Sequence, residues 1–179
     1  ESDRFVILMA ATLRSWKGHS DVLNALTELN DRDFVLMILG DGPQLKNLSK
    51  QVVDAGLQDC VRFYGYSSHI SDFFRVADCF CQPSTKNEGV SQSVLQAFFA
   101  KLPVVATAVS GLNEVVNEQT AIVVEPSNPE SIKSAFIRLK GRDAKTSQRV
   151  VNGYTLVSDR FSYECMINTM VDLYAELAG

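Results

Sequence analysis

The segment Pro83–Val105, PSTKNEGVSQSVLQAFFAKLPVV, carries the strongest indication of fold and ligand in this sequence. It follows a strand-like apolar run, Ala77–Gln82, and contains a lone carboxylate, Glu88, beside Gly89. The residues after Gly89 have the spacing of a helix with one apolar face, and β-branched residues resume after Pro103. In a strand–loop–helix–strand unit, the first helical turn presents free backbone N–H groups and the positive end of the helix dipole. The segment therefore predicts an anion site at this helix start, with Glu88 placed to bind hydroxyls beside it. An anion with attached hydroxyls is typical of a nucleotide-sugar.

Strand-like and helical patterns alternate along the whole chain. Short apolar runs predict six strands, at Phe5–Ala10, Phe34–Leu39, Val61–Tyr64, Ala77–Gln82, Val104–Ala106 and Ala121–Val124. Helical spacing predicts helices at Gly18–Leu29, Leu45–Ala55, Ile70–Val76 and Ser91–Ala100, and further helices in the rest of the chain. This alternation is typical of a doubly wound, Rossmann-like α/β fold, a six-stranded parallel sheet with helices on both faces.

The chain contains no internal repeat and no clear linker, so residues 1–179 are predicted to form a single domain. Ser127 and Glu130 have the spacing of a capping box at the start of a late helix. In doubly wound sheets, ligands bind beyond the carboxyl ends of the strands. The loops that follow the strands are therefore the candidate binding elements.

Composition and motif content exclude several classes of protein. A formal net charge of -4 argues against a general nucleic-acid binder, and no run of eighteen apolar residues predicts a membrane span. The Walker loop, a GxSxG nucleophile motif and a GxGxxG motif after the first strand are all absent. Two histidines, and four cysteines without a CxxC pair, make a poor set of metal ligands, so we expect no metal and no cofactor. Unpaired core cysteines favour a reducing, cytoplasmic compartment.

The loop after the first strand carries two cations, Arg14 and Lys17, directly before Gly18. In a doubly wound sheet this loop lies at the same edge as the loop that holds Glu88. Arginine supplies a planar fork of donors and lysine a compact charge, and both suit a diphosphate. The two side chains are therefore the predicted counter-charges of the anion.

Five short motifs occur in order along the chain: Lys17-Gly18, Gly40-Asp41-Gly42-Pro43, Pro83-Ser84 with Glu88-Gly89, Leu102–Thr107, and Gly111 with Glu114–Val116. With these motifs the chain resembles the C-terminal, nucleotide-sugar-binding domain of GT-B glycosyltransferases of group 1, the retaining family four. The resemblance covers essentially the whole chain. It implies one half of a GT-B enzyme, with an N-terminal acceptor domain absent from this chain and a C-terminal helix, about residues 162–177, packing back.

The resemblance implies a role for each motif. Glu88 is the expected catalytic carboxylate, which contacts hydroxyls of the donor sugar. The expected diphosphate ligands are Lys17, Arg14 as a substitute for the family's usual arginine, and the helix start at Gly89, Val90, Ser91 and Gln92. The expected nucleobase-side loops contribute Gly40, Gly42, Tyr64, Tyr66 and Ser84.

Two positions depart from the family pattern. The family usually has an arginine five residues before the lysine, where this chain has Thr12. It also commonly has a second glutamate that binds the ribose, where this chain has Gln96. An amide binds ribose hydroxyls more weakly than a carboxylate does, by about 1 kcal/mol. Three interpretations stay open: a working transferase, a nucleotide- or partner-binding module that has lost catalysis, and a sugar-nucleotide epimerase of the same architecture.

We favour the first interpretation, the donor-binding domain of a retaining, hexosyltransferase-type glycosyltransferase. The expected donor is UDP- or GDP-linked, and the resemblance points to cell-surface polysaccharide or lipopolysaccharide synthesis. A cytoplasmic location is expected, and a lipid-linked acceptor would bring the full-length protein to the inner membrane face. The isolated domain is expected to be inactive, because the acceptor site belongs to the N-terminal domain.

Overall fold

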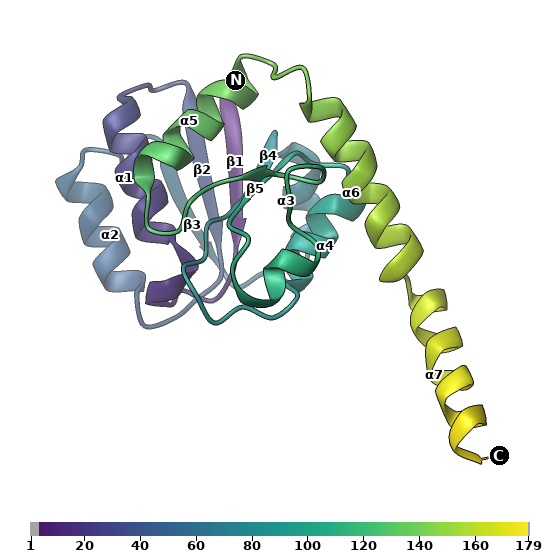
Figure 1. Ribbon diagram of the computed structural model, residues 1–179. Coiled ribbons are helices and arrows are strands. Elements are labelled where there is room, and N and C mark those ends of the chain that lie inside the picture. The colour runs from purple at the N-terminus through teal and green to yellow at the C-terminus, as the bar shows by residue number, and fades with distance from the viewer. Residues whose placement is uncertain (1–3, 179) are drawn as a thin grey trace.

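A six-stranded parallel sheet lies at the centre of the molecule (Figure 1). The computed structural model describes residues 4–178. Its strands are β1 Phe5–Ala10, β2 Phe34–Leu39, β3 Val61–Gly65, β4 Cys79–Gln82, β5 Val104–Ala106 and β6 Ile122–Val123. The strand order is β3-β2-β1-β4-β5-β6, and all neighbouring strands are parallel. The order reverses between β1 and β4, so the predicted doubly wound arrangement is confirmed.

Helices cover both faces of the sheet (Figure 1). They are α1 His19–Leu29, α2 Leu45–Asp54, α3 Ile70–Val76, α4 Gln92–Phe99, α5 Pro129–Lys140, α6 Thr146–Arg160 and α7 Tyr163–Ala178. Two short 3₁₀ turns, Ser15–Lys17 and Ser110–Glu114, lie in the loops after β1 and β5. One face carries α1, α2 and α5, and the other carries α3, α4 and α6.

Alternating residues of the central strands supply two separate cores. Ile7 and Met9 of β1 pack in the core beneath α1, α2 and α5. Leu8 and Ala10 pack in the core beneath α3, α4 and α6. Because both faces are buried, a central strand needs an unbroken apolar run, which is the pattern that the sequence shows.

Some local predictions were wrong. The strand expected from Ala77 begins at Cys79, and the last strand is limited to Ile122–Val123. Ser127 does not cap α5: the N-cap is Asn128, whose side chain accepts a hydrogen bond from the backbone N–H of Ser131 at 3.0 Å. Pro129, the first residue of α5, fixes the start of the helix and so makes the preceding Asn128 the cap.

The last helix, α7, extends away from the sheet (Figure 1). A helix forms near residues 162–177, as expected, and it lies apart from the sheet. It exposes a set of large apolar side chains: Tyr163, Met166, Ile167, Met170, Val171, Leu173, Tyr174 and Leu177. Within residues 4–178, no helix combines the length and apolar content that crossing a bilayer requires.

Candidate functional site

A cavity of about 390 Å³ opens at the carboxyl edge of the sheet, where the strand order reverses. Its lining comes from four segments: residues 10–12 at the end of β1, residues 39–41 at the end of β2, Tyr66, Ser67 and Ile70 after β3, and Gln92, Ser93 and Gln96 of α4. We name this space the edge cavity. It lies where ligands bind in doubly wound sheets.

An ion pair joins the loops after β1 and β4. The Lys17 Nζ atom lies 2.7 Å from Glu88 Oε1 and 3.0 Å from Oε2. Both side chains are largely buried, with exposed fractions of 18% for Lys17 and 5% for Glu88. The structure thus brings together two of the three charged groups that the sequence analysis selected, Lys17 and Glu88. A buried pair of this kind holds its two loops in register, since separating it would leave a charge without a partner.

Buried polar contacts hold the loop that carries Glu88 in place. Ser84 Oγ donates to Glu88 Oε1 at 2.8 Å. Thr107 Oγ1 donates to the Ser84 carbonyl, and the Gly111 N–H donates to the Glu88 carbonyl at 2.8 Å. The Ser84 side chain thus contacts the carboxylate and does not line the edge cavity. Thr107 and Gly111 lie within the recognised motifs, but the sequence did not predict these contacts.

The other predicted residues divide between the edge cavity and its surroundings. Gly40 and Tyr66 line the cavity, whereas Gly42 and Tyr64 do not. The Tyr64 ring instead packs edge-on against Phe73, with 4.9 Å between ring centroids. Gly89, Val90, Ser91 and Gln92 lead into the first turn of α4, as predicted.

Arg14 lies outside the edge cavity. Its side chain is exposed, and its guanidinium carbon lies 5.8 Å from the centroid of the Trp16 ring. Thr12, by contrast, lines the cavity. The position of the family's usual arginine therefore faces the cavity with a neutral hydroxyl.

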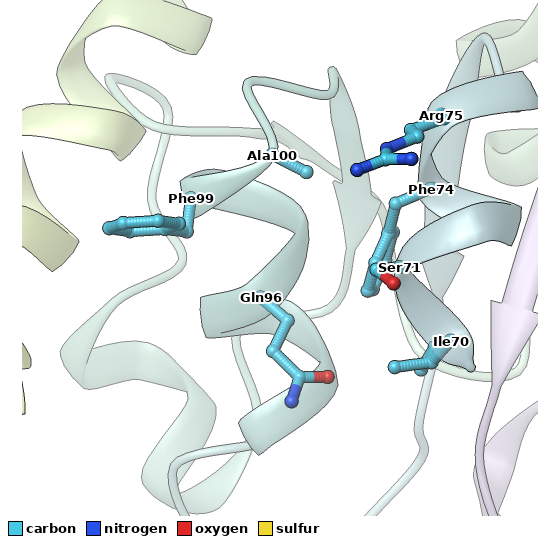
Figure 2. Close-up of a pocket in the computed structure, with 7 residues that line it drawn as sticks. All are labelled: Ile70, Ser71, Phe74, Arg75, Gln96, Phe99 and Ala100. Carbon is cyan, nitrogen blue, oxygen red and sulfur yellow. The ribbon is translucent and has the colours of Figure 1, made fainter. Parts of the chain in front are cut away.

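Gln96 is exposed and lines two spaces at once. One is the edge cavity, and the other is a cavity of about 370 Å³ between α3 and α4. Figure 2 shows the Gln96 side chain extending into the space between the two helices, across from Ile70. Gln96 thus lies outside the buried core, at the cavity that opens beyond the strand ends.

His19 is a buried titratable group next to the ion pair. It is 1% exposed, and neither ring nitrogen has a hydrogen-bond partner among the residues described. Burial, and after it the charge of Lys17, lower the pKa of His19 from 6.5 to about 4. The imidazole is therefore neutral at pH 7 and adds no charge to the anion site. In the part of the chain that the structure describes, no group of three or more His, Cys, Asp and Glu side chains could hold a metal ion.

Comparison with known sequences gives matches over most of the chain. The family model described as "Glycosyl transferases group 1" matches residues 1–154. The lipopolysaccharide core biosynthesis glycosyltransferase LpsD of Rhizobium meliloti is 25% identical over 174 residues, which cover 97% of this chain and 50% of that protein. The alpha-D-kanosaminyltransferase of Streptomyces kanamyceticus is 27% identical over 180 residues, which cover 98% of this chain and 46% of that protein. The exopolysaccharide phosphotransferase SCO2592 of Streptomyces coelicolor is 31% identical over 149 residues, 80% of this chain and 15% of that protein. The chain thus spans half or less of each of these three relatives.

Solved structures of similar shape agree with the observed fold. A glycosyltransferase from Rickettsia africae has a TM-score of 0.91 at 24% identity, covering 99% of this chain and 49% of that one. Anabaena HepE, crystallised with UDP and glucose, has a TM-score of 0.89 at 22% identity, covering 97% and 48%. At these identities the likeness concerns the fold alone.

Proposed function

The chain belongs to the glycosyl transferases of group 1, and from that premise we propose that it is the donor-binding domain of a retaining glycosyltransferase. In this proposal a sugar moves from a nucleotide-sugar to a hydroxyl acceptor with its anomeric configuration retained. The observation that carries the proposal is the contact between Lys17 and Glu88, in two loops that follow parallel strands and so share the sheet edge at which the edge cavity opens. A cation and a hydroxyl-binding carboxylate, next to a helix start, match the charge pattern of a nucleotide-sugar.

Each part of the donor has a complementary group in this arrangement. The nucleoside would occupy the edge cavity, with its ribose near Gln96. The diphosphate would be balanced by Lys17 and by the positive end of α4, with no metal required. Glu88 keeps acceptor capacity on its carboxylate for sugar hydroxyls, since Ser84 and Lys17 occupy only part of it. Arg14 would have to leave the Trp16 ring to contribute.

The proposed partners follow from the length of the relatives and from α7. The chain spans about half of LpsD, so we propose that an N-terminal domain of the full-length protein binds the acceptor. The exposed apolar side chains of α7 are the surface offered to that domain. HepE, which shares this fold, was crystallised with UDP and with UDP-glucose, so UDP is the first nucleotide to test. LpsD supports a role in lipopolysaccharide or polysaccharide synthesis. A cytoplasmic enzyme, peripheral at the inner membrane face when the acceptor is lipid-linked, fits this role. The isolated domain would bind the donor and transfer nothing.

The Lys17→Ala variant tests the proposal. It should weaken the binding of a nucleoside diphosphate by about 1.5–3 kcal/mol, the value of a hydrogen bond to a charged group. Binding of the matching nucleoside should change far less, because Lys17 acts on phosphate charge. Calorimetry with UDP, GDP and ADP and with their nucleosides measures both affinities.

Lys50→Ala is the matched control, because it removes the same charge from an exposed pair with Asp54 on α2. Equal losses of nucleoside and diphosphate affinity in Lys17→Ala would remove Lys17 from the proposed role. A diphosphate loss of the same size in Lys50→Ala would reduce the effect to general electrostatics.

One alternative function has an observation in its favour. Thr12 and Gln96 line the edge cavity at the positions where the family usually has an arginine and a glutamate. The loss of both charges is expected of a module that binds a nucleotide but has lost catalysis. No comparable observation favours an epimerase. Among the residues described, the ionisable side chains that line the cavity are Asp41 and Tyr66.

The Gln96→Glu variant separates the working enzyme from the degenerate module. If Gln96 binds the ribose, this substitution should tighten ribonucleotide binding by about 1 kcal/mol and barely change the affinity of the 2′-deoxy analogue. Gln58→Glu, which adds the same charge at an exposed position after α2, is the control. An equal response of both nucleotides would mean that Gln96 does not bind the ribose and would favour the module.

A further inference from the structure

The first turn of α4 is not capped by its own N-cap residue. Ser91 has the extended backbone of an N-cap, with φ -75° and ψ 121°, yet its side chain makes no capping hydrogen bond. A capping serine normally accepts a hydrogen bond from an amide of the first turn. Without that bond, the first-turn N–H groups of α4 keep their capacity to bind an anion.

Gln82 holds the Ser91 hydroxyl away from the helix. Ser91 Oγ donates to Gln82 Oε1 at 2.9 Å, and Ser93 Oγ donates to the same oxygen at 3.3 Å. The two hydroxyl oxygens lie 3.2 Å apart. Ser93 also lines the edge cavity, so this polar cluster borders the proposed nucleotide site.

The position of Gln82 carries an energetic cost. It is the last residue of β4 and is 1% exposed, and its Nε2 atom has no hydrogen-bond partner among the residues described. A buried amide donor without a partner lowers stability, whereas an apolar side chain of similar volume carries no such cost. The three preceding residues of β4, Cys79–Cys81, are buried and apolar or thiol-bearing. Packing alone therefore does not account for a glutamine at this position.

We propose that Gln82 is a positioning residue that keeps the start of α4 open for the donor diphosphate. By engaging Ser91, Gln82 prevents the helix from satisfying its own first-turn amides, which then remain available to phosphate oxygens. The inference rests on the proposed function, because it takes the anion at this helix start to be a nucleoside diphosphate. It extends that function by assigning a role to a residue beneath the site.

The Gln82→Leu variant gives effects of opposite sign. Removing the buried amide and releasing Ser91 to cap α4 should raise the unfolding midpoint. The ligand for this test is the diphosphate, among UDP, GDP and ADP, that binds the unmodified chain most tightly. Its affinity should fall by about five- to ten-fold, because a capped amide no longer reaches the phosphate. The affinity for the matching nucleoside should stay within about two-fold. A residue with only a structural role would lower stability and affinity together. Gln82→Met, with an unbranched side chain of similar length, repeats the test if the leucine variant does not fold.

The double variant Gln82→Leu/Ser91→Ala isolates the capping step. It lacks the hydroxyl that could cap α4, so its diphosphate affinity should match that of Ser91→Ala alone within about two-fold. Unchanged diphosphate affinity in Gln82→Leu, or a loss that persists in the double variant relative to Ser91→Ala, would overturn the inference and leave the proposed function intact. If the unmodified chain binds none of the three diphosphates, the proposed function fails, and this inference fails with it.

Discussion

The Gly18→Ala variant is expected to lose about 3 kcal/mol of unfolding free energy, because two costs act at one position. Gly18 has φ +77°, a conformation that disfavours alanine. A Cβ atom there would also lie 2.2 Å from the Pro83 carbonyl oxygen and 2.8 Å from Pro83 Cγ. The backbones after β1 and β4 approach too closely for any side chain. Urea or thermal unfolding measures the loss, which corresponds to a fall in Tm on the order of 10 °C for a chain of this size.

The same substitution should also weaken ligand binding, because Gly18 follows Lys17 directly and Pro83 precedes Ser84. Moving these backbones apart separates the ammonium of Lys17 from the carboxylate of Glu88. Gly56→Ala is the matched control: its φ is +65°, and a Cβ there would meet nothing within 4 Å. It should cost only about 1 kcal/mol, the conformational part of the effect. Equal losses in the two variants would show that the contact with Pro83 contributes nothing.

The fold was predictable because its central strands are buried on both faces. Such strands need unbroken apolar runs, and β1 and β2 show them along their whole length. The boundaries were less predictable where hydrogen bonding decides them. Asp78 was expected in a strand, but its side chain accepts a hydrogen bond from the Val6 N–H at 2.7 Å, and β4 begins one residue later. Tertiary contacts of this kind leave no periodic signal.

The charged groups of the site were predictable for a topological reason. Loops that follow parallel strands share one edge of the sheet, so Lys17 and Glu88 had to lie on the same side of the molecule. The orientation of individual side chains was not predictable. Arg14 stacks over Trp16, although its loop alone also allowed it to face the anion site. Ser84 and Gln82 acquire their contacts only when the Glu88 loop and α4 pack above β4, which the sequence around them does not reveal.

The packing partner of α7 was not predictable, for a different reason. The resemblance implied a helix near residues 162–177, and that helix forms with an apolar stripe along it. An apolar stripe indicates that something packs against it, but it does not indicate what. In this structure the stripe is exposed, and the proposed N-terminal domain is the surface that we expect to pack against it.

Acid should destabilise the chain through His19 by about 3 kcal/mol between pH 6.5 and pH 4. Burial first, and then the charge of Lys17, lower the folded-state pKa of His19 to about 4, from a usual value of 6.5. Within this window the unfolded chain binds a proton at His19 and the folded chain does not. The contribution of His19 to the free energy of unfolding is therefore fully present above pH 6.5 and is lost as the pH falls towards 4. Urea unfolding at pH 7 and pH 4.5 measures the change.

The His19→Leu variant should lose most of this pH dependence while keeping its stability at pH 7. Neither ring nitrogen of His19 has a partner among the residues described, so an apolar side chain gives up no hydrogen bond seen there. Asp143 responds in a separate window, because the Lys145 N–H, followed by Arg138 and Arg149, lowers its pKa to about 2. His69→Leu, at an exposed position, is the control and should keep the wild-type difference between the two pH values. If His19→Leu also keeps the full difference, His19 is not the group that titrates, and the acid sensitivity belongs to carboxylates elsewhere in the fold.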